Sequence, residues 1–119
     1  MEKVIVLQSV KDTDLIKLMK KSKALLFPSF AEGWGLPLVE AIALKVPAIC
    51  SDIDVLRESG QNLVEYVDPY DPVRWLKVIK EYSIDKDGVR STQIKNIEKY
   101  KMPTWDNYFV NFLNAAKHI

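Results

Sequence analysis

The 119-residue sequence has one cysteine, one histidine and four glycines. The single cysteine, Cys50, cannot form an internal disulfide, and such sparse cysteine usage is typical of a reducing cytosol. Cysteine and histidine are also too few to supply a cluster at zinc-ligand spacing, so we expect no metal site. These absences exclude disulfide-stapled and zinc-dependent classes, and Cys50 is expected to be a small buried hydrophobe.

The sequence also lacks an excess of either charge and lacks long apolar runs. The chain carries 17 basic and 16 acidic side chains, a net charge of +1, whereas a nucleic-acid-binding protein is expected to show a basic excess. The apolar run 4–7 is too short for a signal peptide, and no stretch approaches the length of a membrane span. We therefore expect a cytoplasmic protein, with residues 1–119 forming a single domain and no nucleic acid as partner.

The residues that are present alternate between short apolar runs and longer helical patterns, and 48% of them are hydrophobic. Strands alternating with helices indicate an α/β fold with a parallel sheet flanked by helices. We expect strands at 4–7, 24–27, 46–50 and 63–67. We expect helices at about 12–21, 36–44, 55–59, 72–82 and 85–100, and a last one after Thr104.

Aspartates and threonines before these helices are candidate caps. Asp12 or Thr13 is expected to cap the first helix and Asp52 or Asp54 the third. The turn 68–72 contains aspartates that can cap the helix after it, and prolines that fix its backbone. The patterns predict apolar faces at Leu15, Ile16, Leu18 and Met19 in the first helix, and at Trp75, Leu76, Val78 and Ile79 in the fourth.

The stretch 27–41 is the centre of the functional hypothesis. It contains a strand that stops at Pro28, a loop with two glycines, and a helix that opens at Leu36 or Pro37. In an open parallel sheet such a loop lies at the carboxyl end of a strand, where these folds bind ligands. A helix N-terminus there favours an anion such as a phosphate.

These residues resemble a known family. The segments Phe27-Pro28-Ser29, Glu32-Gly33-Trp34-Gly35-Leu36-Pro37 and Glu40-Ala41 are similar to retaining nucleotide-sugar glycosyltransferases of the GT-B class, family-4 type. Glu32 and Glu40 are separated by seven residues, which is the E-x7-E pattern of that family. Residues 46–49, 56–58 and 66–69 and Trp105 add to the resemblance. It implies a Rossmann-like sheet and part of the C-terminal, nucleotide-sugar-binding domain.

The resemblance also implies roles for single residues. Glu32 would contact hydroxyls of the donor sugar and help to stabilise the transition state, and Glu40 would accept hydrogen bonds from the ribose. Ser29 either bonds to ligand or merely ends its strand. The implied backbone contacts to sugar, diphosphate and base come from Gly33, Trp34, Gly35, Leu36, Leu38 and Val10. No metal and no cofactor are implied, because helix dipoles and basic side chains shield the diphosphate.

The family's acceptor-binding domain and its upstream basic pair have no counterpart in this sequence. The expected partners are therefore a nucleotide sugar, and either a separate acceptor-binding domain or a second copy of the chain. We expect no sugar transfer to a glycan or lipid-linked acceptor from these residues alone. The alternative is a non-catalytic fragment of this fold that binds nucleotide or a partner.

Lysines 17, 20, 21 and 23 leave a second alternative open. They form either a solvated helix end, the commoner case, or a peripheral contact with anionic lipid at the inner face of the membrane.

Overall fold

The computed structural model describes residues 11–30, 36–100 and 114. The expected strand at 4–7 and the expected helix after Thr104 lie outside these ranges. The elements in chain order are α1 (Asp12–Lys21), β1 (Leu25–Phe27), α2 (Leu36–Ala43), β2 (Ala48–Ser51), α3 (Asp54–Gly60), β3 (Glu65–Val67), α4 (Pro72–Ser83), the 3-10 turn η1 (Lys86–Gly88) and α5 (Val89–Lys99).

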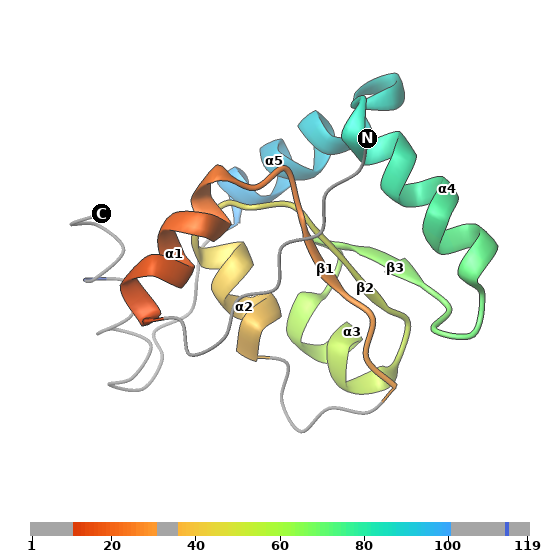
Figure 1. The fold of residues 1–119 in the computed structure, drawn as a ribbon, viewed down its shortest axis with the longest axis horizontal. Helices are drawn as coiled ribbons and strands as arrows, with labels where there is room; N and C mark the ends of the chain where they lie inside the picture. Colours follow the sequence, from red (N-terminus) through yellow and green to blue (C-terminus); the bar gives the residue numbers. More distant parts are fainter. Residues whose placement is uncertain (1–10, 31–35, 101–113, 115–119) are drawn as a thin grey trace.

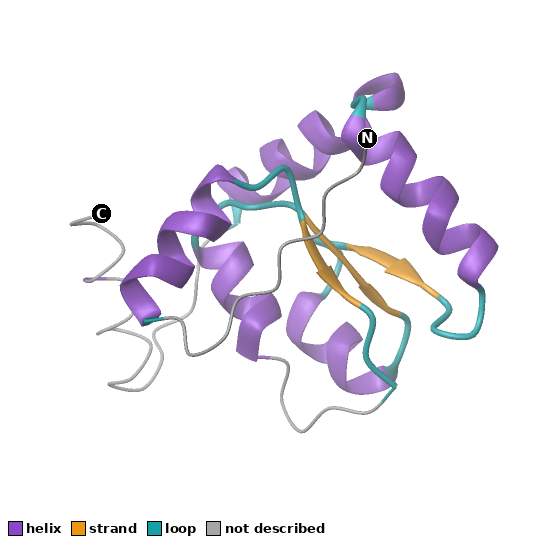
Figure 2. Cartoon of the chain, viewed as in Figure 1, coloured by secondary structure: helices purple, strands orange, loops and turns teal. Residues whose placement is uncertain are grey.

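The three strands form a parallel sheet in the order β1-β2-β3 (Figure 2). Leu25 pairs with Ala48 and Phe27 pairs with Cys50, so all three residues of β1 are paired with β2. β3 pairs along the other side of β2. The prediction of an α/β fold with a parallel sheet flanked by helices is confirmed.

Side chains of β2 alternate between two apolar clusters, one on each face of the sheet. Cys50 belongs to a cluster that contains Leu38 of α2 and Leu56 of α3. Ile49 belongs to the other, with Val78 of α4. The helices α2 and α3 therefore cover one face and α4 covers the opposite face (Figure 1).

Helix starts agree with the sequence only in part. Asp71 caps α4, because its carboxylate accepts a hydrogen bond from the backbone N–H of Arg74 at 3.0 Å. The cap expected of Asp12 or Thr13 in α1 is wrong, since the N-cap position is Lys11 and its side chain makes no capping hydrogen bond.

The third helix corrects the prediction in the same way. The N-cap of α3 is Ile53, which has no side-chain cap, rather than Asp52 or Asp54. The carboxylate of Asp52 instead accepts two charge-assisted hydrogen bonds from the guanidinium of Arg57.

Three leucines predicted on apolar faces are exposed: Leu15, Leu18 and Leu76. In α1 only the stripe formed by Ile16 and Met19 turns toward the core. The helical repeat separates these positions by about 100° from the leucines before them, so the apolar sequence is wider than the face that packs.

The segment predicted as one helix over 85–100 is divided. Asp87 and Gly88 have positive φ values of 53° and 71°, which end η1 before α5 begins. The carboxylate of Asp85 accepts hydrogen bonds from the backbone N–H groups of Arg90 and Ser91, at 2.8 and 3.1 Å. A carboxylate four residues before α5 thus satisfies donors of its first turn.

Candidate functional site

The three strands end together at one edge of the sheet. Phe27 pairs with Cys50 and Ser51 with Val67, and the N–H of Asp52 donates to the carbonyl of Val67 at 2.8 Å. Helix α2 begins beside this carboxyl edge (Figure 1). The structure therefore places the described part of the 27–41 stretch where open α/β sheets bind ligands.

The first turn of α2 is suited to an anion. It contains no acidic side chain, and the first N–H groups of a helix have no acceptor within the helix. Pro37 supplies no N–H, which leaves the backbone of Leu36 and Leu38 as donors. The side chain of Leu38 is fully buried, so only its backbone can meet a ligand.

Glu40 lies one turn into α2 and is half-buried. Pro37, one turn before it, is exposed and Glu40 is half-buried, whereas the neighbouring Val39 and Ala41 are buried. The carboxylate therefore follows the helix N-terminus on the side of α2 that solvent reaches. This position suits a diol ligand, since charge-assisted hydrogen bonds are the stronger ones.

Ser29 is half-buried and stands two residues after the end of β1. Its backbone N–H donates to the carbonyl of Phe27 at 3.0 Å, which closes a tight turn at the strand end. The next residue, Phe30, is exposed, and the centroids of its ring and of the Tyr70 ring lie 5.1 Å apart, with the two ring planes inclined by 56°. Sequence patterns do not predict this aromatic pair, because its members are 40 residues apart.

Five of the predicted site residues lie outside the described ranges. They are Val10, Glu32, Gly33, Trp34 and Gly35. Their roles stay predictions, and the described part of the site consists of Ser29, the start of α2, and Glu40.

An ion pair missed by the sequence analysis lies at the same edge. Arg57 of α3 binds Asp52 through Nη2–Oδ2 at 2.9 Å and through Nε–Oδ1, and its guanidinium lies 4.5 Å above the ring of Tyr66. The hydrogen bonds from Arg57 lower the pKa of the Asp52 carboxyl. The pair is exposed, and the negative charge of Asp52 compensates the positive charge of Arg57. The pair therefore presents little net positive charge to a ligand.

Cys50 is fully buried in β2. Burial, reinforced by the negative charge of Asp52, raises the pKa of its thiol to about 12. The thiol is therefore protonated at neutral pH and is no nucleophile, in agreement with its expected place in the core.

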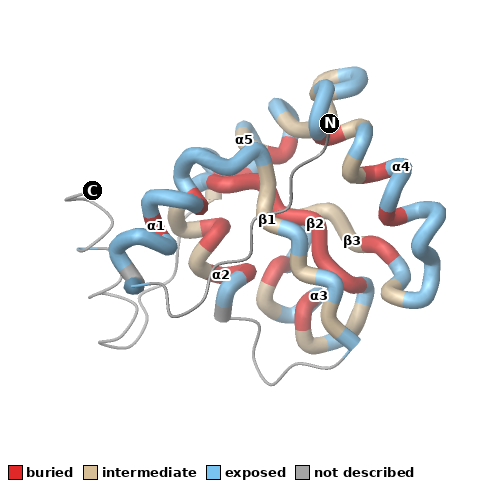
Figure 3. Tube along the Cα trace, viewed as in Figure 1, coloured by how far each residue is buried: buried red, intermediate tan, exposed pale blue. Residues whose placement is uncertain are grey.

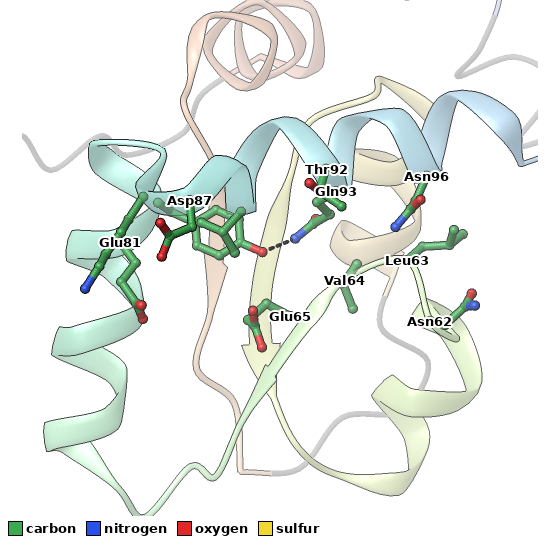
Figure 4. Close-up of a pocket in the computed structure, with 12 residues that line it drawn as sticks. Asn62, Leu63, Val64, Glu65, Glu81, Asp87, Thr92, Gln93 and Asn96 are labelled. Atoms are coloured by element: carbon green, nitrogen blue, oxygen red, sulfur yellow. Dashed lines mark hydrogen bonds between the residues drawn. The ribbon is translucent and has the colours of Figure 1, made fainter.

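The opposite end of the sheet contains a polar cavity of about 440 Å³, lined by the start of β3, by α4 and by α5 (Figure 4). Gln93 closes its inner wall. Its Oε1 accepts from the N–H of Ala48 at 2.7 Å, and its Nε2 donates to the Ala48 carbonyl at 3.2 Å and to the Tyr82 hydroxyl at 2.6 Å.

The side-chain amide of Gln93 therefore makes the two hydrogen bonds to β2 that the backbone of an adjacent strand would make. Ladder pairing between β2 and β3 begins at Ile49, and the side-chain amide of Gln93 satisfies the backbone of Ala48 just before it. The sequence analysis missed this residue, although Gln93 stands four positions from both Val89 and Ile97 on the inward stripe of α5. We assign a structural role to this end of the molecule.

Across residues 11–30 and 36–100, no three acidic, cysteine or histidine side chains lie where they could hold a metal ion together. No helix in these ranges combines the length and the apolar character needed to cross a membrane.

Three bacterial proteins illustrate what this chain is similar to. The "O-antigen chain mannosyltransferase RfbU" of Salmonella typhimurium is 42% identical over 117 residues, which are 98% of this chain and 33% of the relative. The "O-antigen chain mannosyltransferase B" of Escherichia coli is 31% identical over 91% of this chain and 28% of its own length. A "Serotype-specific mannosyltransferase WbdA" of Escherichia coli is 37% identical over 68% of this chain and 10% of its own length.

The chain thus spans about a third or less of the relatives it matches. No solved structure matches it significantly. The family model described as "Glycosyl transferases group 1" matches residues 1–100, which include every described strand and helix through α5. This protein belongs to the glycosyl transferases group 1 family.

Proposed function

We propose that the chain is the donor-binding part of a retaining glycosyltransferase of the family-4 type. The complete enzyme transfers a sugar from a nucleotide-diphosphate sugar to a glycan or lipid-linked acceptor. The observation that carries the proposal is the position of α2. Its N-terminus, free of acidic side chains in the first turn, lies at the carboxyl edge of the sheet, and the half-buried Glu40 follows one turn later.

The relatives suggest which sugar and which product are involved. All three are mannosyltransferases by name, and two are named for the O-antigen chain. We infer that the donor is a nucleotide-activated mannose and that the acceptor is a growing polysaccharide of this kind.

The proposed roles at the site follow the resemblance. Glu32 contacts the sugar, Glu40 holds the ribose, and the backbone at Gly33–Leu38 faces the sugar and diphosphate, with Val10 near the base. Hydrogen-bond donors fixed around the diphosphate stabilise the charge that builds there as the glycosidic bond breaks. The proposed reaction uses these groups and requires no cofactor.

The magnitudes predict weak binding by the isolated chain. A helix N-terminus contributes about 0.3–1 kcal/mol, and up to about 2 kcal/mol when partly buried. Millimolar affinity corresponds to about 4 kcal/mol, so the ribose contact of Glu40 has to supply much of the rest. Sugar transfer further requires the acceptor-binding part, and we expect none from residues 1–119 alone.

An NMR titration of the chain with UDP, GDP and ADP and with their mannose esters tests the proposal. We expect shifts at millimolar ligand that cluster between Ser29 and Ala41, with one base preferred over the others. Glu40→Gln keeps the shape of the side chain but removes the charge that strengthens the ribose hydrogen bonds, so it should weaken binding about tenfold.

Glu81→Gln is the matched control, because Glu81 is also a half-buried helical glutamate but lies at the opposite end of the sheet. It should leave the affinity unchanged. Equal losses in the two variants, or shifts confined to the cavity around Gln93, would contradict the proposed site. A folded chain that binds none of these ligands would favour a partner-binding fragment.

The proposed place of action is the cytoplasm, next to the membrane that carries a lipid-linked acceptor. The lysines of α1 and Lys23 are exposed, as are Leu15 and Leu18 beside them. Such a mixed surface is compatible with peripheral contact with anionic lipid. Co-sedimentation with vesicles of anionic against neutral lipid distinguishes this contact from a merely solvated helix.

A further inference from the structure

Two exposed aromatic rings lie together at the carboxyl edge of the sheet. The ring centroids of Phe30 and Tyr70, which we call the ring pair, are 5.1 Å apart, and the two residues are 62 and 80% exposed. Aromatic side chains contribute most to a fold when they are buried, so rings that leave most of their surface in solvent add little to the core. Apolar surface gathered in one place marks an interaction site more often than a single exposed side chain does.

The fold brings these two rings together from separate strands. Phe30 stands three residues after the end of β1, and Tyr70 stands three residues after the end of β3. Because β2 lies between them, β1 and β3 are about 10 Å apart, and the turns that follow them have to converge. The ring pair is therefore a product of tertiary structure, at the end of the sheet where open α/β folds bind ligands.

Hydrogen bonds fix the backbone of both turns. In the first, the N–H of Ser29 donates to the carbonyl of Phe27 at 3.0 Å. In the second, Oδ1 of Asp68 accepts from the N–H of Tyr70 at 2.9 Å, and the Asp68 carbonyl accepts from the indole N–H of Trp75 at 3.1 Å. The backbone that carries each ring is thus ordered before a ligand arrives, which lowers the entropic cost of binding.

The chemistry of the ring pair fits a sugar. One face of a pyranose consists of C–H groups, and these pack against the electron-rich face of an aromatic ring. The hydroxyls around the sugar need hydrogen-bond acceptors. The exposed carboxylates of Asp68 and Asp71 stand on either side of Tyr70 in the chain, and carboxylates are strong acceptors for hydroxyl groups.

The charge around Tyr70 indicates a neutral sugar rather than a nucleotide. Asp68 and Asp71 contribute two negative charges, and Arg74 in the first turn of α4 contributes one positive charge, so the segment 68–74 remains negative. A diphosphate would be repelled there. The start of α2, which has no acidic side chain in its first turn, is the better place for the anion.

The ring pair lies beside the proposed donor site without being part of it. Phe30 directly follows Ser29, and it lines a hollow together with Trp75 of α4. Helix α4 packs on one face of the sheet and α2 packs on the other. A ligand on the ring pair therefore reaches the same edge of the sheet from the α4 side, as the second substrate of a transferase would.

We propose that the ring pair is a subsite for one pyranose ring of the acceptor saccharide. The proposal rests on the proposed function, because it takes the acceptor to be a growing polysaccharide, as the names of the O-antigen mannosyltransferases suggest. Phe30 and Tyr70 bind and orient this sugar, and neither side chain takes part in the bonds that form and break.

An NMR titration with mannotriose, an uncharged saccharide without a nucleotide, tests the proposal. We expect the ring signals of Phe30 and Tyr70 to shift, with saturation transfer from these rings to C–H protons of the sugar and a Kd of about 1–10 mM. Phe30→Ala and Tyr70→Ala should each weaken binding about three- to tenfold. Tyr70→Leu keeps apolar bulk but has no aromatic face, so it should weaken binding as Tyr70→Ala does.

Ile84→Ala is the matched control, because Ile84 is also a large apolar residue, is 73% exposed, and follows the other end of α4. It should leave the affinity unchanged. All of these substitutions are at exposed positions, so the variants are expected to remain folded, and the dispersion of their NMR spectra checks this.

Several outcomes would overturn the proposal. They are the absence of shifts at mannotriose concentrations well above the expected Kd, shifts that persist unchanged in both ring variants, and an equal loss in Ile84→Ala. Displacement of mannotriose from the rings by a nucleotide-activated mannose would also overturn it, because the rings would then belong to the donor. If mannotriose binds and no nucleotide does, the ring-pair proposal stands and the donor-site proposal fails; the reverse result rejects the ring pair alone.

Discussion

Strands β1 and β2 lie side by side in register, yet they differ sharply in burial. All four residues of β2 are buried, whereas Leu26 in the middle of β1 is exposed and its neighbours are only half-buried (Figure 3). The sequence Leu-Leu-Phe of β1 is more apolar than the Ala-Ile-Cys-Ser of β2. Hydrophobicity of the residues therefore does not decide which strand is enclosed.

The neighbours decide it. β2 has a strand on each side and an apolar cluster on each face, and Gln93 satisfies the backbone at its start. In the described ranges β1 has one strand neighbour and an open groove over Leu26. The burial of β2 therefore follows from its neighbours on both sides and both faces.

The largest expected effect separates the two strands directly. Ile49→Ala removes a fully buried side chain of β2 and should lower the free energy of unfolding by about 2–5 kcal/mol. Leu26→Ala removes a side chain that is 43% exposed, so it should lower the free energy of unfolding by less than about 1 kcal/mol. Urea denaturation of both variants checks this. Similar losses would mean that β1 is as enclosed as β2 in the isolated chain.

A second variant removes the side-chain hydrogen bonds at the start of β2 and leaves its apolar side chains intact. Gln93→Ala leaves the N–H and the carbonyl of Ala48 without their side-chain partner, and an unsatisfied buried group costs about 1–3 kcal/mol. Water can enter through the adjoining polar cavity, so we expect a total loss of about 2 kcal/mol in urea denaturation. Thr92→Ala, at an exposed position of the same helix, is the control and should change little.

The sequence predicted the fold through features that are local. Apolar runs bounded by prolines and aspartates located β1, β2 and β3, and the Asp71–Pro72 pair located the start of α4. The position of Glu40 on α2 followed in the same way from helical spacing.

The features that the sequence analysis missed depend on partners far along the chain. Gln93 and Ala48 are 45 positions apart, and Phe30 and Tyr70 are 40 positions apart. Periodicity within a helix cannot name such partners. The same limit explains Leu76, because its apolar character is visible in the sequence but its exposure in the fold is not.

Alkaline pH should affect β2 through Cys50, and β1 contains no titrating side chain. Cys50 has a pKa of about 12 in the folded chain and an ordinary value of 9.0, so its contribution to stability is complete below pH 9. As pH rises from 9 toward 12, the unfolded chain loses this proton first. The free energy of unfolding should fall by about 1.4 kcal/mol per pH unit on this account.

The control isolates this thiol from other groups. Burial also raises the pKa of Tyr66, and burial with the charge of Glu65 raises that of Tyr82 to about 12, so both tyrosines add to the same decline. Cys50→Ala should keep their share and lose that of the thiol. Urea denaturation at pH 8, 9 and 10 measures the two slopes, and identical slopes would show that Cys50 reaches solvent in the folded chain.

The smallest expected effect tests how firmly Gln93 is held. Tyr82→Phe removes the hydroxyl that accepts a hydrogen bond from Gln93 at 2.6 Å, and should cost about 1 kcal/mol in urea denaturation. Tyr70→Phe, at a position that is 80% exposed, should cost nothing measurable. Because the hydrogen bond to Gln93 is already lost in Gln93→Ala, adding Tyr82→Phe to that variant should lower stability by less than Tyr82→Phe does alone. Additive losses would instead mean that α4 and α5 support β2 independently, and that the enclosure of β2 does not depend on a single side-chain network.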